Sequence, residues 1–219
     1  MKIIALYAVI SLTLIISLNK ANEANAYFIG GEAQCGSLSN PDGPFDYRRH
    51  DFSKGIPQST NHFTPQIENL QGGRTSFLLD DIDYTLREWP NHHRALWAIS
   101  RLERQNNGSL PNAHMLSGWR RSADCYFDRA MRFTPDDGTV RMLYGMHLHL
   151  SGHPRRALPH FEKAAELGED SAEFHYNFGL LLFDLRDYRA AREQAEKAYS
   201  LGHPLPGLRN RLQRAGHWN

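Results

Sequence analysis

The chain carries 12 histidines, and histidine is the side chain best suited to acid–base catalysis and metal binding near neutral pH. His92 and His93 are adjacent, so in a helix their side chains point about 100 degrees apart and do not easily share one metal ion. His147 and His149 also lie on different faces of a helix. The motif HExxH, paired Cys/His zinc ligands, GxSxG and the phosphate-loop pattern are all absent. The sequence therefore predicts no catalytic residue, no metal site and no cofactor.

Clustered carboxylates are the second group of residues that could bind a metal ion or take part in catalysis. Asp80, Asp81 and Asp83 stand within four residues and could hold a divalent ion, but runs of charge are more often a solvated helix face. Asp136 and Asp137 precede an expected helix, where carboxylates cap the N-terminus. We therefore expect structural roles for these groups. The alternative is a hydrolase or metal-dependent envelope enzyme whose histidines are brought together only by the fold.

The first 26 residues have the pattern of an export signal. Lys2 is followed by sixteen uncharged residues, Ile3 to Leu18, and the sequence Ala24-Asn25-Ala26 places small residues where a signal peptidase reads them. Cleavage before Tyr27 is therefore predicted. The alternative is a retained membrane anchor, since sixteen apolar residues fall just short of the ~20 that span a bilayer. We expect a periplasmic or secreted protein, with no stable membrane insertion after cleavage.

Cys35 and Cys125 are the two cysteines of the chain. In an oxidising compartment a lone pair is more often bonded than free, so a Cys35–Cys125 disulfide is predicted. It would close a loop of about ninety residues, worth roughly 4–5 kcal/mol in the chain-entropy model. The alternative is two free thiols, with Cys125 buried as a small hydrophobe. Two cysteines cannot build a disulfide scaffold or a Cys-only zinc site, so an apolar core must hold the fold.

The overall composition excludes one class of partner. Hydrophobic residues make up 41% of the 219 residues and charged residues 22%, the balance of a folded globular protein. The 25 basic and 24 acidic residues give a formal net charge of +1. Broad nucleic-acid binding normally requires a basic face that neutralises phosphates. We therefore expect no nucleic-acid partner.

Four sets of identical residues recur at a spacing of 34 residues. The recurring residues are Ala123, Ala157 and Ala191; Ala130, Ala164 and Ala198; Phe127 and Phe161; and Gly145 and Gly179. The small residues allow close approach of helices, and the phenylalanines fill the wedge between successive units. The period and the residue types resemble the tetratricopeptide repeat, a helix–turn–helix unit.

This resemblance implies an all-α fold, a right-handed superhelical solenoid of about three to four units. Helices are expected over 138–150 with 155–167, 172–184 with 188–200, 95–104 with 122–133, and over 64–71, 77–88 and 207–214. Residues 27–61 are expected as an irregular extension, 62–200 as the repeat array with its best repeats over 122–200, 105–119 as an insertion, and 201–219 as a C-terminal cap helix and tail. The piece CGSLSNPDGPFDYR also resembles exported bacterial repeat proteins. That second resemblance implies a location in a Gram-negative envelope and no activity.

Tetratricopeptide arrays bind peptides or helices of partner proteins in a concave groove that is lined by the first helix of each unit. Carried onto this sequence, the groove positions are Arg94, Trp97, Arg101, Arg104, Thr139, Met142, Met146, His149, Glu173, Tyr176, Asn177, Leu180 and Phe183. Chaperone-binding members hold a C-terminal carboxylate with lysines and asparagines, and of those residues only Asn177 is present. The resemblance therefore implies an adaptor that binds another protein, with no catalysis of its own and a groove suited to a short amphipathic segment.

Overall fold

The structure is a computed structural model that describes residues 31–41, 43–49, 62–72, 78–111 and 122–218. The predicted export signal over 1–26 lies outside these residues. The described part of the chain is all-α: it contains ten α-helices and one 3-10 helix, and its β structure is limited to an isolated bridge between Asn40 and Gly43. Within the same residues, no helix combines the length and the apolar character needed to cross a membrane.

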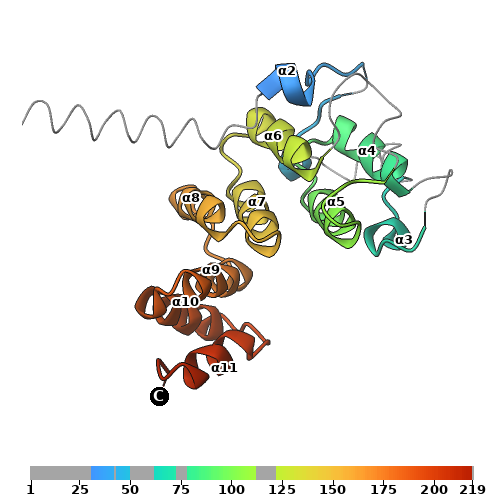
Figure 1. Ribbon diagram of the computed structural model, residues 1–219. Coiled ribbons are helices and arrows are strands. Elements are labelled where there is room, and N and C mark those ends of the chain that lie inside the picture. The colour runs from blue at the N-terminus through green and yellow to red at the C-terminus, as the bar shows by residue number, and fades with distance from the viewer. Residues whose placement is uncertain (1–30, 42, 50–61, 73–77, 112–121, 219) are drawn as a thin grey trace, which may run out of the picture.

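The helices follow one another from the N-terminal part of the stack to its C-terminal end (Figure 1). They are α2 (Gly31–Cys35), the 3-10 helix η1 (Tyr47–Arg49), α3 (Pro65–Glu68), α4 (Leu78–Glu88), α5 (His93–Gln105), α6 (Ala123–Phe133), α7 (Gly138–Leu150), α8 (Pro154–Glu166), α9 (Ala172–Asp184), α10 (Tyr188–Ser200) and α11 (Gly207–Arg214). The helices α7 to α10 match their predicted ranges to within one residue. The helix predicted over 64–71 is shorter, because Leu70 takes a left-handed backbone conformation with φ 57°.

Local sequence signals set the helix ends. Ser122, Asp137, Ser171 and Asp187 are N-caps whose side chains accept a hydrogen bond from the backbone N–H three residues on. Gly152, Gly168 and Gly202 follow the ends of α7, α8 and α10, each with φ 85°. Glycine adopts this left-handed conformation without strain, so the same stop signal recurs along the chain.

The recurring small residues lie where helices pack most closely. A Cβ added to Gly145 would lie 2.7 Å from Cδ2 of Phe161 on α8, and one added to Gly179 would lie 2.5 Å from Cδ2 of Leu208 on α11. The six recurring alanines and both recurring phenylalanines are fully buried: Ala123, Ala130, Ala157, Ala164, Ala191, Ala198, Phe127 and Phe161. The residues that recur every 34 positions are therefore residues at which helices pack against each other.

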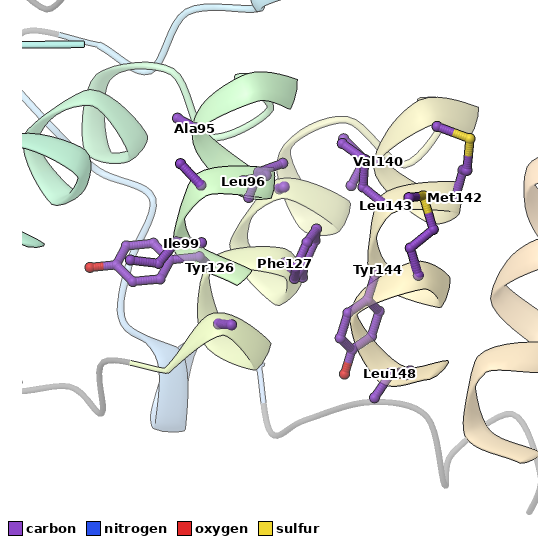
Figure 2. Packing of buried hydrophobic residues seen from close by; sticks show 14 of the residues in the cluster. Ala95, Leu96, Ile99, Tyr126, Phe127, Val140, Met142, Leu143, Tyr144 and Leu148 are labelled. Atoms are coloured by element: carbon purple, nitrogen blue, oxygen red, sulfur yellow. The ribbon is translucent and has the colours of Figure 1, made fainter. Parts of the chain in front are cut away.

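A continuous apolar core runs from α3 to α9, and a second cluster joins α9, α10 and α11. Figure 2 shows Leu96 and Ile99 of α5 beside α6, and Phe127 of α6 directed toward α7. The rings of Phe127 and Tyr144 stack with centroids 5.0 Å apart. Aromatic stacking thus links α6 to α7 in the middle of the core.

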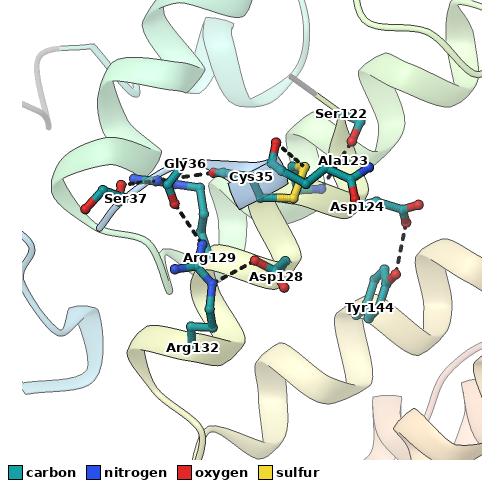
Figure 3. Close-up of a disulfide and its surroundings, with 12 residues drawn as sticks. Cys35, Gly36, Ser37, Ser122, Ala123, Asp124, Asp128, Arg129, Arg132 and Tyr144 are labelled. Atoms are coloured by element: carbon teal, nitrogen blue, oxygen red, sulfur yellow. Dashed lines mark hydrogen bonds and ion pairs between the residues drawn. A yellow bond between two sulfur atoms is a disulfide. The ribbon is translucent and has the colours of Figure 1, made fainter. Parts of the chain in front are cut away.

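The predicted disulfide is confirmed: Cys35 at the end of α2 is bonded to Cys125 in α6 (Figure 3). Arginines of α6 reinforce this attachment. Arg129 donates to the backbone oxygen of Ser37, and Arg132 donates to that of Gly36 at 3.0 Å. A covalent bond and two charged hydrogen bonds therefore hold the segment after α2 against α6.

A second polar cluster ties residues 45–49 to the helices. Asn91 donates to Asp46 at 2.7 Å and accepts from the backbone N–H of Tyr47 at 2.9 Å. Hydrogen bonding from Arg48 lowers the pKa of Asp46 to about 2. Asp137, the N-cap of α7, lies 3.0 Å from His93 and 3.4 Å from Arg48. Part of the segment expected to be irregular is thus anchored by side chains at the starts of α5 and α7.

The expectation that Asp80, Asp81 and Asp83 form a solvated helix face is wrong for two of the three. Asp81 is 1% exposed and lies 2.8 Å from Nδ1 of His62. Asp83 is fully buried, where it accepts from the hydroxyl of Tyr126 at 2.6 Å and from Arg87 at 3.0 Å. Buried carboxylates require such partners, and these two join α4 to residues far along the chain.

Candidate functional site

The predicted groove begins on α5, and we call Arg94, Trp97, Arg101 and Arg104 the α5 surface. Arg94 donates to the side chain of Glu68 at the end of α3, with Nε 2.7 Å from Oε1. This contact lowers the pKa of the Glu68 carboxyl. Arg101 donates to the backbone oxygen of the same Glu68. One edge of the α5 surface is therefore held by α3.

Trp97 and Arg104 form the other edge of the α5 surface. Trp97 is half-buried against the core, and the guanidinium of Arg104 lies 5.3 Å from the centre of its ring. This is the geometry of a cation–π contact. Burial lowers the pKa of Arg104, and its Nε has no hydrogen-bond partner among the described residues. The pair thus combines an aromatic ring with a cation at one edge of the α5 surface.

The groove positions of α7 offer little apolar surface. Met142 and Met146 are each 6% exposed and belong to the core. Thr139 donates to Glu169 at 2.6 Å, and Nε2 of His149 lies 2.8 Å from Asp184. The two polar groove residues of α7, Thr139 and His149, are therefore already bonded to neighbouring elements.

The groove positions of α9 are largely occupied by contacts with the C-terminal part of the chain. Tyr176 is 8% exposed and stacks on His203 with ring centroids 3.8 Å apart. The guanidinium of Arg211 on α11 lies 4.8 Å from the ring centre of Phe183. Asn177 donates to its neighbour Glu173. Leu180 is half-buried against the second apolar cluster.

The predicted groove residues thus differ in how far their side chains are accessible to another molecule. Those on α7 are buried or bonded to neighbouring elements, and those on α9 pack against the C-terminal part of the chain. The α5 surface has a half-buried tryptophan beside Arg104, with Arg94 and Arg101 bonded to Glu68. Aromatic residues and arginine dominate the energetics of protein interfaces. Within the predicted groove, the α5 surface is the strongest candidate for a contact with another molecule.

The fold also forms a polar cavity that the sequence did not predict. We call it the edge cavity; its volume is about 350 Å³, and it lies among the ends of α5 and α7 and the starts of α6 and α8. Its lining residues are Gln34, Glu103, Arg104, Gly108, Ser122, Asp124, His147, Leu148, Ser151, His153 and Arg156. Six of these side chains are titratable or permanently charged. Burial lowers the pKa of two of them, Arg104 and His147, and groups with shifted pKa values cluster at functional sites.

His147 lies at the inner wall of the edge cavity and is 4% exposed. Its Nδ1 is 3.0 Å from Oγ of Ser100, and its Nε2 is 3.8 Å from Oε1 of Glu103 and 3.7 Å from Oδ1 of Asp124. Burial lowers the pKa of His147 to about 4, so the imidazole is neutral at pH 7.

Serine, histidine and carboxylate are also the components of a nucleophilic triad. Ser100, however, is fully buried in the core, and its hydroxyl is out of reach of a substrate in this structure. We therefore assign the contact between Ser100 and His147 to packing between α5 and α7.

The two carboxylates beside His147 are positioned by other helices. Oε2 of Glu103 accepts from the backbone N–H of Ala123 at 2.8 Å, at the start of α6. Asp124 accepts from the hydroxyl of Tyr144 at 3.0 Å (Figure 3). Burial is the main cause that raises the pKa of Tyr144, so this hydroxyl keeps its proton and acts as a donor. Within the described residues, no three His, Cys, Asp or Glu side chains are grouped so as to hold a metal ion.

The edge cavity had no signal in the sequence because its side chains come from separate helices, each contributing one or two. The only available clue was one of position: Ser100 is the eighth residue of α5, and Gly145 is the eighth residue of α7. Since a serine replaces the glycine there, its hydroxyl needs a buried partner, and His147 supplies it.

Comparison with known proteins adds no assignment. A scan against models of protein families gives no match for this chain, and a search of curated proteins finds none similar to it.

Proposed function

We propose that the protein is an exported binding module built from tetratricopeptide-type repeats, which recruits another protein through a segment of that partner. It performs no catalysis of its own. Three features support the repeat assignment: the 34-residue spacing, the helix pairs α7 with α8 and α9 with α10, and the small residues at the closest helix contacts. Under this proposal the first helices α5, α7 and α9 line the inner face of a solenoid.

The observation that carries the binding role is the pairing of Trp97 with Arg104 on the α5 surface. A half-buried tryptophan needs little reorganisation to bind an apolar side chain, and the guanidinium of Arg104 lies 5.3 Å from its ring centre. Arg94 and Arg101 lie on the same helix face. The α5 surface therefore suits a partner segment that combines an apolar anchor with one or more carboxylates.

The disulfide and its surroundings support the export part of the proposal. Disulfides persist in oxidising compartments such as the periplasm and the extracellular space, and the Cys35–Cys125 bond is fully buried. Cleavage of residues 1–26 and release into the periplasm or the medium are part of the same proposal.

The test is affinity capture from the native envelope, followed by direct measurement of binding with the retained partner. Trp97→Ala is expected to weaken the affinity at least about tenfold, as removal of an interface tryptophan usually does. Leu201→Ala is the matched control, because Leu201 is a large apolar residue that is 52% exposed at the opposite end of the stack. Equal affinity of Trp97→Ala and Leu201→Ala would move the interface away from the α5 surface. Thermal unfolding of each variant separates a binding defect from a folding defect.

A further inference from the structure

A second cavity lies at the C-terminal end of the stack, where the turn between α9 and α10 meets the residues that follow α11 (Figure 1). We call it the terminal cavity; its volume is about 570 Å³, within the range known for small-molecule sites. Its lining includes Arg186, Arg189, Arg192, His217, Tyr188 and Asp187. Three arginines face one carboxylate, so this lining is mainly cationic.

Arg186 has a backbone conformation that favours glycine. Its φ is 66°, and the residue 34 positions earlier, in the matching turn between α7 and α8, is Gly152 with φ 85°. The two turns are otherwise alike, because the N–H of either residue donates to the backbone oxygen three residues before it at 3.0 Å. A left-handed conformation strains an arginine but not a glycine. Residues in such conformations cluster at functional sites, so the arginine here indicates a role for its side chain.

The side chain of Arg186 is also free of internal partners. It is exposed, it lines the terminal cavity, and no hydrogen bond or ion pair joins its guanidinium to any residue that the structure describes. All its N–H donors are therefore available to an acceptor from outside the protein.

The other two arginines of the lining are only partly engaged. Nε of Arg189 donates to Glu193 at 3.2 Å, and Nε of Arg192 donates to Glu196 at 2.8 Å. Exposed ion pairs within one helix add little stability. Both pairs use Nε alone, so the terminal nitrogens of the two guanidinium groups can donate to a ligand as well.

The carboxylate of the lining is held by the helix that it begins. Asp187 is the N-cap of α10, and its Oδ1 accepts from the backbone N–H of Ala190 at 3.0 Å. The ring of Tyr188 stacks on that of His217 with centroids 4.3 Å apart. This contact attaches the residues after α11 to the start of α10 and so forms the wall beside the arginines.

The surrounding part of the chain is basic as well. Residues 186–219 contain seven Lys or Arg and three Asp or Glu, whereas the whole chain has a formal net charge of only +1. The excess of positive charge is therefore concentrated at the end of the stack that holds the terminal cavity. Such a field attracts anions toward the cavity.

We propose that the terminal cavity binds a phosphate group, with Arg186 as its principal ligand and Arg189 and Arg192 beside it. A planar guanidinium donates to two phosphate oxygens at once, and several cations favour a doubly charged group over a singly charged carboxylate. The phosphate group can belong to inorganic phosphate, to a soluble phosphomonoester or to a lipid headgroup. This site does not depend on the α5 surface being a protein-binding surface.

The first experiment is calorimetric titration of the full disulfide-bonded protein with inorganic phosphate, glycerol 3-phosphate and acetate. We expect at least one phosphate compound to bind with a Kd below about 5 mM, within reach of a small anion held by charged hydrogen bonds. Acetate should bind at least about tenfold more weakly, because it carries a single charge.

A second titration tests the lipid headgroup as the source of the phosphate. Vesicles of phosphatidylcholine with phosphatidic acid are compared with vesicles that carry oleate at equal surface charge. Retention by phosphatidic acid alone, together with weak binding of the soluble compounds, assigns the site to a lipid headgroup. Binding of the soluble compounds without retention by vesicles assigns it to a free phosphate.

Arg186→Gly is the decisive variant, because it introduces the residue that the matching turn has at position 152. It should weaken phosphate binding at least about tenfold, yet it should not lower the melting temperature, since glycine adopts the left-handed conformation without strain. Arg186→Gln keeps a side chain at this position and should lose binding in the same way. Should Arg186→Gly unfold the protein, Arg186→Gln still decides the question.

The repeat also supplies a matched control. Arg155 and Arg189 occupy the same position of successive units, 34 residues apart, and both are exposed, but only Arg189 lines the terminal cavity. Arg189→Gln should weaken phosphate binding, whereas Arg155→Gln should bind as the unchanged protein does.

Three outcomes would overturn the proposal. One is that neither the soluble compounds, up to a Kd of about 5 mM, nor phosphatidic acid vesicles bind. Another is that acetate and oleate bind as tightly as their phosphate counterparts, or that Arg155→Gln and Arg189→Gln lose affinity equally, either of which would indicate general surface charge. The last is that Arg186→Gly and Arg186→Gln bind phosphate as tightly as the unchanged protein.

Discussion

The hydroxyl of Ser100 in α5 and Nδ1 of His147 in α7 lie 3.0 Å apart within the core. Ser100 is the eighth residue of α5, and the eighth residues of α7 and α9 are Gly145 and Gly179. A hydroxyl at a tightly packed position must be bonded, so this pair replaces one of the small-residue contacts by a hydrogen bond. The same bond fixes the imidazole that forms the inner wall of the edge cavity.

Ser100→Ala is expected to destabilise the protein, because it leaves Nδ1 of the buried His147 without its partner. The expected loss in the free energy of unfolding is about 1–3 kcal/mol, the cost of an unpaired buried polar group. Urea unfolding measures it. Ser109→Ala is the control, since Ser109 is exposed and should change little. An unfolding midpoint for Ser100→Ala equal to that of the control would show that the Ser100 contact adds no stability.

Gly145→Ala and Gly179→Ala are expected to differ, although alanine normally favours a helix over glycine by roughly 0.5–1 kcal/mol. The new Cβ at position 145 would lie 2.7 and 2.8 Å from two atoms of the Phe161 ring, a rigid group that is fully buried. The new Cβ at position 179 would meet a terminal methyl of Leu208, which can rotate away. We therefore predict a loss of about 1–3 kcal/mol for Gly145→Ala and a smaller loss for Gly179→Ala.

A double-mutant cycle identifies the cause of the Gly145→Ala effect. Phe161→Leu removes the ring atoms nearest to the new Cβ, so Gly145→Ala should cost less in that background. A coupling free energy of at least about 0.5 kcal/mol is expected for residues in direct contact. Additive effects of the two substitutions would contradict the predicted clash.

The boundaries of α7 to α10 could be predicted from the sequence because their signals are local. The repeat period, the N-cap residues Ser171 and Asp187, and the glycines after the helices all act within a few positions. The end of α3 was mispredicted because the left-handed conformation of Leu70 has no comparable local signal.

Burial was harder to predict than helix position, since it depends on residues far along the chain. The sequence predicts that Asp83 is a surface charge. In the structure the hydroxyl of Tyr126, 43 positions further on, donates a hydrogen bond to it within the core. Met142 and Tyr176 have the spacing of groove residues, yet both are nearly buried in the structure. Only three-dimensional packing separates a residue that lines a groove from one that fills the core.

Loss of the disulfide is expected to destabilise the protein by an amount approaching 4–5 kcal/mol, roughly the chain-entropy value for a loop of this length. The bond joins residues 90 positions apart. Chemical denaturation with and without a reducing agent measures the effect. Cys35→Ser should reproduce the reduced protein and should not respond to the reducing agent. A reduced protein as stable as the oxidised one would show that the contacts of Arg129 and Arg132 hold the segment after α2 by themselves.

Acid is expected to destabilise the protein well above the pH at which carboxylates protonate. Burial lowers the pKa of His92 and His147 to about 4 and that of His160 to about 3, whereas unfolded histidine titrates near 6.5. Between these values the unfolded state binds more protons than the folded state. Stability is therefore fully present above about pH 6.5 and is lost as the pH falls toward 4, and each histidine adds a slope of up to about 1.4 kcal/mol per pH unit.

The measurement is the free energy of urea unfolding at about pH 7.5, 6.5, 5.5 and 4.5, a window that spans the unfolded and folded pKa values of these histidines. His160→Gln removes one of the three groups. It should reduce the slope of the free energy of unfolding against pH by up to about 1.4 kcal/mol per pH unit, the contribution of one proton. His217→Gln is the control, because His217 is exposed and its replacement should leave the slope unchanged. Asp46 adds little to this window, since its lowered pKa, about 2, costs stability only below about pH 4. A free energy of unfolding that stays constant from neutral pH down to the lowest of these values would mean that these histidines are charged inside the folded protein.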